Sequence, residues 1–269
     1  MLAVWREADD IDVYESGWTF DHFYPIYSDS TGSCLEGWIT LAALAQATQR
    51  LRLGTLVTGI HYRHPAVLAN MASALDIVSG GRLELGIGAG WNEEESGAYG
   101  IELGTIKERF DRFEEACQVL TGLLSQETTD FDGKYLQLNA ARNEPKGPQK
   151  PHPPICIGGS GEKRTLRITA RYAQHWNFLG GTPQEFARKR DVLASHCAEI
   201  GRDPKEIMLS AHVWLSPELD YTKAVADAAA LGEEGLDLAI IYLPTPHDPA
   251  VLEPLAEAIR DSGLADRAS

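Results

Sequence analysis

The stretch RLELGIGAGWNEEE, residues 82–95, decides the fold that we expect for this chain. In an extended strand, side chains alternate between two faces, so Leu83 and Ile87 share a face while glycines recur on the other. Glycine weakens a strand interior, and three in register indicate that something comes close to the backbone. The sequence predicts a bare strand end at Gly86, Gly88 and Gly90 that could accommodate a planar ligand. The alternative is a tight corner or bulge without one.

Short apolar runs alternate with helical patterns on both sides of this stretch, which is typical of βα units around a parallel sheet. The helices are expected over residues 35–48, 65–79, 107–124, 161–172, 221–232 and 249–262, with another opened by a capping box at Thr182 and Glu185. The strands are expected over residues 17–21, 51–58, 82–88, 153–158, 173–178, 207–215 and 236–243.

A barrel of this kind closes with eight strands, so seven leave the first strand missing. We therefore expect one α/β domain over residues 1–269, a (β/α)8 TIM barrel without its first strand and part of its first helix, and a natural gene product that starts earlier. Residues 128–154 read as an insertion with a hairpin around Asp132 and Gly133, of the kind that often forms a wall or lid over a site.

Composition excludes several classes of function. Lys and Arg number 24 against 39 Asp and Glu, and the resulting charge of −15 would repel a nucleic-acid backbone. The four cysteines have neither metal-ligand spacing nor a disulfide framework, which favours a reducing cytoplasm. No apolar run is long enough to span a membrane, and no metal site is expected.

Polar residues follow the expected strands, at the edge where barrel enzymes build their active sites. In TFDHFYP, residues 19–25, His22 could exchange a proton near neutral pH while Asp21 orients or charges it. The alternative is a structural histidine with satisfied hydrogen bonds.

A second strand end, GTLVTGIHYRHP at residues 54–65, carries His61, Arg63 and His64. These side chains could face an anionic ligand, or they could pair with surface acids. The three glutamates at 93–95 are expected to be a solvated run or a helix start rather than catalytic acids.

A third strand end, ICIGGSGEKRTLRITARYA at residues 155–173, places small residues before a helix. Backbone N–H groups and the helix dipole at such a turn favour an anion, with phosphate the usual ligand. The pattern is neither the dinucleotide fingerprint nor a P-loop, and a plain tight turn is the alternative.

Three segments together resemble the bacterial luciferase-like flavin-dependent oxidoreductases, in particular the branch that uses the deazaflavin coenzyme F420. They are FDHFYP, the run from Arg50 to Glu95, and PPICIGGSGEKRTLRITARYAQHWN, within a likeness that covers residues 3–260. The resemblance implies a (β/α)8 barrel, commonly dimeric, with the flavin ring over the strand ends and its phosphate at a βα loop.

The resemblance also implies a role for particular residues. His22 would be the proton donor or acceptor near the ring, supported by Asp21, and a non-proline cis peptide or bulge is expected between Thr55 and Thr58. The residues implied in cofactor binding are Thr55, Val57 and Thr58 behind the ring, Gly88, Gly90, Trp91 and Asn92 beside it, Gly158, Gly159, Ser160, Gly161, Lys163 and Arg164 at the phosphate, and Trp176 and Asn177 at the next strand end.

The implied reaction is hydride transfer between F420 and a small organic substrate. One alternative is an FMN-dependent monooxygenase, and another is a non-catalytic or incomplete flavin-binding barrel. The resemblance further implies a homodimer, with the apolar helix at 37–48 as one candidate interface, and a separate reductase that supplies reduced cofactor.

Overall fold

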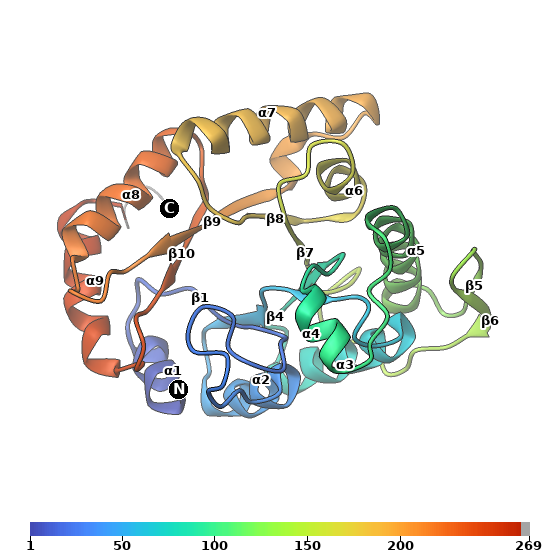
Figure 1. The fold of residues 1–269 in the computed structure, drawn as a ribbon, viewed down its shortest axis with the longest axis horizontal. Helices are drawn as coiled ribbons and strands as arrows, with labels where there is room; N and C mark the ends of the chain where they lie inside the picture. The colour runs from blue at the N-terminus through green and yellow to red at the C-terminus, as the bar shows by residue number, and fades with distance from the viewer. Residues whose placement is uncertain (265–269) are drawn as a thin grey trace. The chain divides into compact units, whose positions relative to one another are not determined.

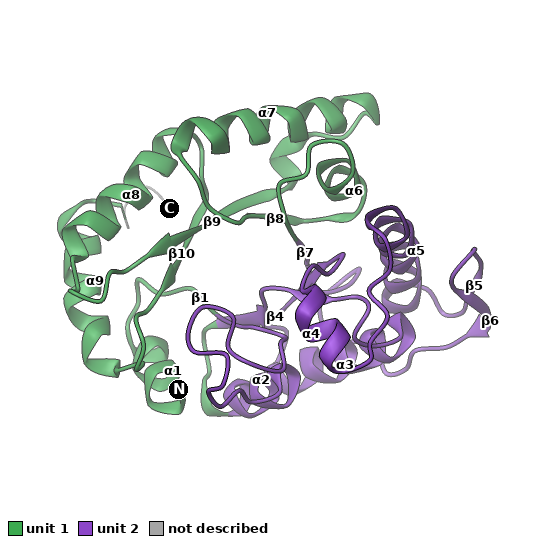
Figure 2. Ribbon diagram, in the orientation of Figure 1, with its two compact units in different colours: residues 1–17, 47–51, 158–269 green, residues 18–46, 52–157 purple. Residues whose placement is uncertain are grey.

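The computed structural model describes residues 1–264, and Figure 1 shows their helices and strands. The chain forms two compact units, which Figure 2 colours separately. Unit 1 comprises residues 1–17, 47–51 and 158–269, and unit 2 comprises residues 18–46 and 52–157. The expectation of a single domain stays a prediction.

Unit 2 contains a parallel sheet in which β4 pairs with three other strands. Leu53 pairs with Leu83, Thr58 with Ile87, and Ile87 in turn with Ile157. Every residue of β4 is buried. The parallel strands are β2 (Arg52–Thr55), β3 (Thr58–Gly59), β4 (Leu83–Gly88) and β7 (Ile155–Gly158, whose last residue belongs to unit 1), and the helices are α2 (Gly37–Ala47), α3 (Pro65–Ser79), α4 (Glu93–Ala98) and α5 (Ile106–Ser125).

Local sequence signals explain where the helices of unit 2 begin and end. Pro65 occupies the first position of α3, the His64 side chain accepts a hydrogen bond from Ala66 N, and Gly80 ends the helix at a φ of 70°. Thr105 and Glu108 form a capping box at the start of α5.

The hairpin expected within residues 128–154 is confirmed. Strands β5 (Thr129–Asp132) and β6 (Gln137–Ala141) pair antiparallel. The Glu115 carboxylate on α5 accepts hydrogen bonds from three consecutive amides of the turn, those of Lys134, Tyr135 and Leu136. The role of this segment as a lid stays a prediction.

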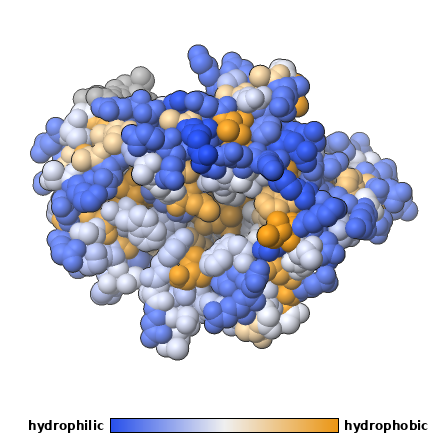
Figure 3. All heavy atoms as spheres, turned by 45° about the horizontal axis from the view of Figure 1, so that its top comes forward, coloured by the Kyte–Doolittle hydropathy of each residue, from blue (hydrophilic) through white to orange (hydrophobic). Residues whose placement is uncertain are grey.

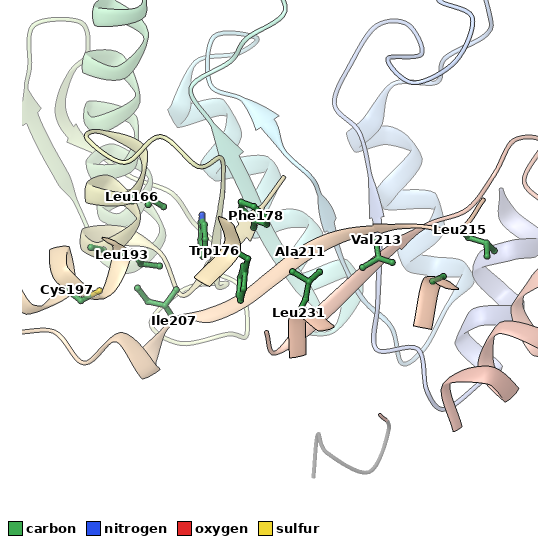
Figure 4. Packing of buried hydrophobic residues seen from close by; sticks show 13 residues of the cluster. Leu166, Trp176, Phe178, Leu193, Cys197, Ile207, Ala211, Val213, Leu215 and Leu231 are labelled. Carbon is green, nitrogen blue, oxygen red and sulfur yellow. The ribbon is translucent and has the colours of Figure 1, made fainter. Parts of the chain in front are cut away.

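Unit 1 contains β8, β9 and β10, which are parallel, with Asn177 paired to Ser210 and His212 paired to Ile240. Figure 4 shows the apolar cluster on which helices α6 to α8 pack, including Trp176, Ala211 and Val213. The elements that lie in unit 1 are α1 (Leu2–Asp10), α6 (Thr165–Tyr172), β8 (His175–Phe178), α7 (Pro183–Glu199), β9 (Met208–Trp214), α8 (Tyr221–Glu233), β10 (Leu238–Tyr242) and α9 (Leu252–Asp261), while β1 (Ser16–Thr19) spans the boundary between the units.

The predicted elements all occur, with three differences. The strand expected over 51–58 is interrupted, so β2 and β3 are separate. Helix α6 begins at Thr165 rather than at 161, because residues 162–164 form a turn. Helix α4 was foreseen only as a possible helix start. The capping box at Thr182 and Glu185 is confirmed.

Hydrophilic residues cover much of the face shown in Figure 3, in keeping with the net charge of −15. Within residues 1–264, none of the helices combines the length and the apolar character that a membrane crossing requires.

Candidate active site

Asp21 and His22, which follow β1, form hydrogen bonds with different partners. Both Nη atoms of Arg63 donate to the Asp21 carboxylate, and the Nη2–Oδ1 distance is 3.0 Å. Asp21 is buried, so this two-point ion pair is shielded from water. The prediction that Asp21 supports His22 is therefore wrong, because the carboxylate is used by Arg63.

The carboxylate that supports His22 is Glu95. Asn92 accepts a hydrogen bond from Glu95 N and so begins α4, which places the fully buried Glu95 side chain beside His22. Glu95 Oε2 lies 2.7 Å from His22 Nδ1 and also accepts from the Tyr62 hydroxyl, while Oε1 accepts from Phe23 N at 2.6 Å. The expectation that Glu95 is part of a solvated run is wrong, although Glu93 does start a helix.

The environment of Glu95 keeps it ionised. Burial raises the pKa of this carboxyl, but the hydrogen bonds from Tyr62, Phe23 N and His22 outweigh burial and lower its pKa below the ordinary value. Burial, followed by the Glu95 charge, raises the pKa of Tyr62 well above its usual value, so the phenol keeps its proton. Tyr62 is therefore a donor to Glu95 across the neutral range.

This arrangement fixes the tautomer of His22. A carboxylate only accepts hydrogen bonds, so Nδ1 of His22 must carry a hydrogen that it donates to Glu95. The other ring nitrogen, Nε2, has no hydrogen-bond partner among residues 1–264. In the neutral ring Nε2 is then a proton acceptor, and in the charged ring a proton donor.

The bare strand end expected at Gly86, Gly88 and Gly90 is not open to a ligand. A Cβ on Gly86 would lie 1.7 Å from the Thr55 carbonyl oxygen, one on Gly88 would meet Val57 Cγ2 at 2.9 Å, and one on Gly90 would meet His61 Nδ1 at 2.4 Å. The protein's own atoms occupy the space beside each glycine. The glycines are needed because Thr55, Val57 and His61 pack closely against β4 and the loop after it, and not because a planar ligand lies there.

The segment between β2 and β3 has the expected non-proline cis peptide, between Leu56 and Val57. Thr55 and Thr58 on its two sides are buried and their hydroxyl oxygens lie 2.9 Å apart, while Trp38 Nε1 donates to Thr58 Oγ1 at 2.9 Å. Because these hydroxyls bond to other side chains of unit 2, Thr55 and Thr58 support the segment. Their implied role as direct cofactor contacts is not supported.

His61 and Arg109 hold the loop that follows β4. His61 Nε2 lies 3.2 Å from Ser96 Oγ, Arg109 Nη1 donates to Gly90 O at 3.3 Å, and His61 Nδ1 is buried without a hydrogen-bond partner in the described part of the chain. Burial lowers the pKa of His61 to about 4, so the ring is neutral at pH 7. The loop presents Trp91, which is 61% exposed and whose ring centroid lies 5.7 Å from that of His22.

In unit 1, the loop from Gly158 to Gly161 leads into α6 as expected. Gly159 has a φ of 123°, and within residues 1–264 no side chain caps α6 at Arg164. The one acidic side chain of the turn, Glu162, pairs with Lys189 at 2.8 Å and with Arg188 at 3.1 Å. Glycine-rich backbone, an uncapped helix start and the exposed Lys163 together fit a phosphate group.

Trp176 and Asn177 at the end of β8 face opposite sides of the strand. Trp176 is fully buried, stacks on Phe186 at 5.8 Å and donates from Nε1 to Gly159 O at 2.7 Å. Its predicted contact with a cofactor is wrong, because the ring lies in the core and supports the loop instead. Asn177 Nδ2 donates to Ser210 Oγ at 2.9 Å, and its buried Oδ1 has no partner among the described residues.

Sequence reasoning missed Glu95 and Tyr62. The available signal was the spacing of Asn92 and Glu95, which is that of a helix N-cap and its third residue, directly after a strand end. The structure brings together His22, Trp91 and Asn92 within unit 2, while Gly158–Gly161, Lys163, Arg164 and Asn177 lie in unit 1.

Comparisons with known proteins show which family the chain belongs to. The chain is 30% identical over 220 residues to the pyrimidine monooxygenase RutA of Agrobacterium fabrum, an alignment that covers 77% of this chain and 59% of that protein. It is 31% identical over 225 residues to the F420-dependent hydroxymycolic acid dehydrogenase of Mycobacterium tuberculosis, which covers 80% and 58% of the two chains. The chain thus spans about three fifths of the length of these relatives.

Among solved structures, the coenzyme F420-dependent tetrahydromethanopterin reductase of Methanopyrus kandleri matches with a TM-score of 0.80 and 16% identity, over 97% of this chain and 94% of that one. This likeness confirms the expected α/β barrel fold. The family model for luciferase-like monooxygenases matches residues 6–268. The chain therefore belongs to the luciferase-like monooxygenase family, which includes F420-dependent and flavin-dependent oxidoreductases.

Proposed function

We propose that this chain is an oxidoreductase that passes a hydride between coenzyme F420 and a small organic substrate. The observation that carries the proposal is the dyad of His22 and Glu95, which prepares one ring nitrogen of His22 to take or give a proton. The similarity to an F420-dependent dehydrogenase supports the choice of cofactor.

Several described residues, each taken within its own unit, are of kinds that suit a part of such a cofactor. Gly159 N already donates to Asn177 O at 3.1 Å. The amides of Ser160 and Gly161, with Lys163 and Arg164, would hold a phosphate, since they lie in a glycine-rich turn before a helix start that has no side-chain cap among the described residues. Asn177 offers a buried carbonyl oxygen that has no partner among residues 1–264, and Trp91 offers an exposed ring beside His22. When bound, the deazaflavin would supply the two-electron hydride carrier.

His22 would handle the proton that accompanies the hydride. When an alcohol is oxidised, its carbon loses a hydride and its oxygen loses a proton, which Nε2 of neutral His22 can accept. Glu95 then faces an imidazolium, whose positive charge its carboxylate stabilises at Nδ1. In the reverse direction, the protonated ring returns the proton to the carbonyl oxygen.

An FMN-dependent monooxygenase is the second candidate. The similarity to pyrimidine monooxygenase RutA favours it, since this relative matches about as well as the dehydrogenase does. FMN shares the phosphate that the Gly158 loop would bind, so this loop does not separate the two cofactors.

A titration with each cofactor, followed by absorbance, tests the proposal. Saturable binding of F420 and turnover of its reduced or oxidised form support it. Binding of FMN without F420 favours the monooxygenase, and binding of neither refutes both and leaves a non-catalytic barrel.

His22→Ala tests the proton step. We expect turnover to fall about 10²-fold or more with nearly unchanged cofactor affinity, because general acid–base catalysis contributes on this scale. His152→Ala is the matched control, since His152 precedes β7 and lies 2.7 Å from Pro153 O. Loss of affinity with normal turnover in the His22 variant would contradict the assigned role.

The proposal includes a homodimer, a separate reductase that supplies reduced cofactor, and a place in the cytoplasm. Helix α2 supports the dimer, because most of its residues are apolar and Ile39 is 74% exposed. The four cysteines, all within residues 1–264, are unpaired, which supports a reducing compartment.

A further inference from the structure

The strands of unit 1 have one face that no helix of the core cluster covers. Side chains alternate along each strand, and Ala211, Val213 and Ile241 belong to the cluster with α7 and α8, as Figure 4 shows for the first two. The alternate residues therefore face the other way. They are His175 and Asn177 on β8, Met208, Ser210, His212 and Trp214 on β9, and Leu238, Ile240 and Tyr242 on β10.

Three of these side chains form an aromatic group at the carboxyl ends of β9 and β10. Trp214 and Tyr242 pair in register, and their rings stack with centroids 4.3 Å apart at an angle of 25°. The His212 ring lies 4.7 Å from that of Tyr242, and its Nε2 is 3.4 Å from the Tyr242 hydroxyl. Trp214 is 50% exposed, so the group presents a ring to the surroundings.

The aromatic group carries no charge at neutral pH. Burial lowers the pKa of His212 to about 4, which leaves the ring neutral. None of the nine residues on this face of β8 to β10 is Lys, Arg, Asp or Glu. These residues provide no charge to compensate an ionised ligand for the loss of its hydration. For an uncharged planar ligand, the free-energy cost of leaving water is small.

One polar atom in the group lacks a partner. His212 Nδ1 is buried and makes no hydrogen bond with the described part of the chain. Buried polar groups are nearly always hydrogen-bonded, so an unpaired one next to an exposed aromatic ring indicates a place for a ligand atom. An apolar wall with one or two polar points is the usual composition of a small-molecule site.

We propose that His212, Trp214 and Tyr242 bind the organic substrate, and that this substrate is an uncharged planar ring compound with one hydrogen-bonding group directed at His212 Nδ1. The inference rests on the proposed function, since it names the substrate class of that oxidoreductase. It concerns a surface within unit 1 and adds residues that the sequence did not single out.

Binding of 4-fluorophenol to the full chain without cofactor, followed by fluorine NMR, tests the inference. The probe is planar and uncharged and has one hydrogen-bonding group, and 4-fluorobenzoate is its charged counterpart. We expect saturable binding of the phenol that weakens at least tenfold in Trp214→Ala, and no saturable binding of the benzoate. In His212→Phe, which keeps an aromatic ring at this position and removes both ring nitrogens, binding should weaken several-fold.

Ile200→Ala is the control, because it removes an exposed apolar side chain of the same unit and should bind the phenol normally. Equal binding of the benzoate, no binding of the phenol by the unaltered protein, or unchanged binding in Trp214→Ala overturns the inference. The inference is also overturned if Trp214→Ala weakens F420 or FMN binding as much as it weakens binding of the phenol. The aromatic group would then contact the cofactor rather than the substrate. Failure of the proposed function has a different signature, namely that neither cofactor binds the unaltered chain.

Discussion

Gly86→Ala separates two explanations of the glycines in β4. If the bare strand end were a ligand slot, an added methyl group would weaken cofactor binding and leave stability nearly unchanged. In the structure the new Cβ would lie 1.7 Å from the Thr55 carbonyl oxygen, far inside van der Waals contact. The nearest obstacle is backbone, which cannot rotate away as a side chain can, so we expect a loss of stability.

The size of the loss follows from the contact. Overpacking a core commonly costs 1–3 kcal/mol, and a clash with backbone belongs at the upper end, so we expect about 3 kcal/mol. For a chain of this length that corresponds to a fall of roughly 6–12 °C in Tm. Gly232→Ala in α8 is the matched control, because no atom of the described residues lies within 4 Å of its new Cβ. It should be neutral or stabilise by about 0.5 kcal/mol.

Urea unfolding of the three proteins, followed by circular dichroism, measures both effects, and a cofactor titration of the folded variants accompanies it. A Gly86→Ala protein as stable as the unaltered chain, with weakened cofactor binding, would refute the close packing of Thr55 on β4. It would restore the slot that the sequence suggested.

Three further outcomes are expected. Glu95→Gln should lower turnover about 10²-fold and shift the pH–rate profile without changing cofactor affinity, because His22 loses its charged partner; an unmoved profile would contradict the dyad. The free energy of unfolding should fall as the pH is lowered from about 6.5 to about 4, by up to about 3 kcal/mol for each of His61 and His212. The reason is that these histidines bind a proton near pH 6.5 in the unfolded chain but only near pH 4 in the folded one. His61→Gln should flatten this slope in urea titrations at several pH values, and an unchanged slope would argue against a buried neutral ring. Ile39→Glu should turn a dimer into a monomer in light scattering, and a monomeric unaltered protein would remove the dimer from the proposal.

The elements could be predicted from the sequence because their signals are local. The βα alternation, the proline at 65, and the capping box at Thr182 each depend on a few neighbouring residues. The cis peptide within residues 55–58 followed from the resemblance, and His22 from its place at a strand end.

The partners of these residues could not be predicted, because they depend on long-range contacts. Nothing near Asp21 in the sequence shows that its carboxylate accepts hydrogen bonds from Arg63, 42 residues away. Nor does it show that the carboxylate beside His22 is that of Glu95, 73 residues from the histidine. The sequence does not show which of the three glutamates at 93–95 is buried. Glu95 differs from its exposed neighbours only because the turn of α4 directs its side chain inward. The glycines do mark a close approach, but the approaching atoms belong to Thr55, Val57 and His61 of the protein itself.

Cys34 offers a means of observing this site without altering the sequence. Of the four cysteines, all within residues 1–264, it is the exposed one, and its Sγ lies 3.5 Å from the backbone oxygen of His22. Burial, followed by the Glu95 charge, raises the pKa of this thiol, so a maleimide dye should attach slowly at pH 7 and faster in mildly alkaline buffer. A fluorophore attached there would report ligand arrival at the dyad directly.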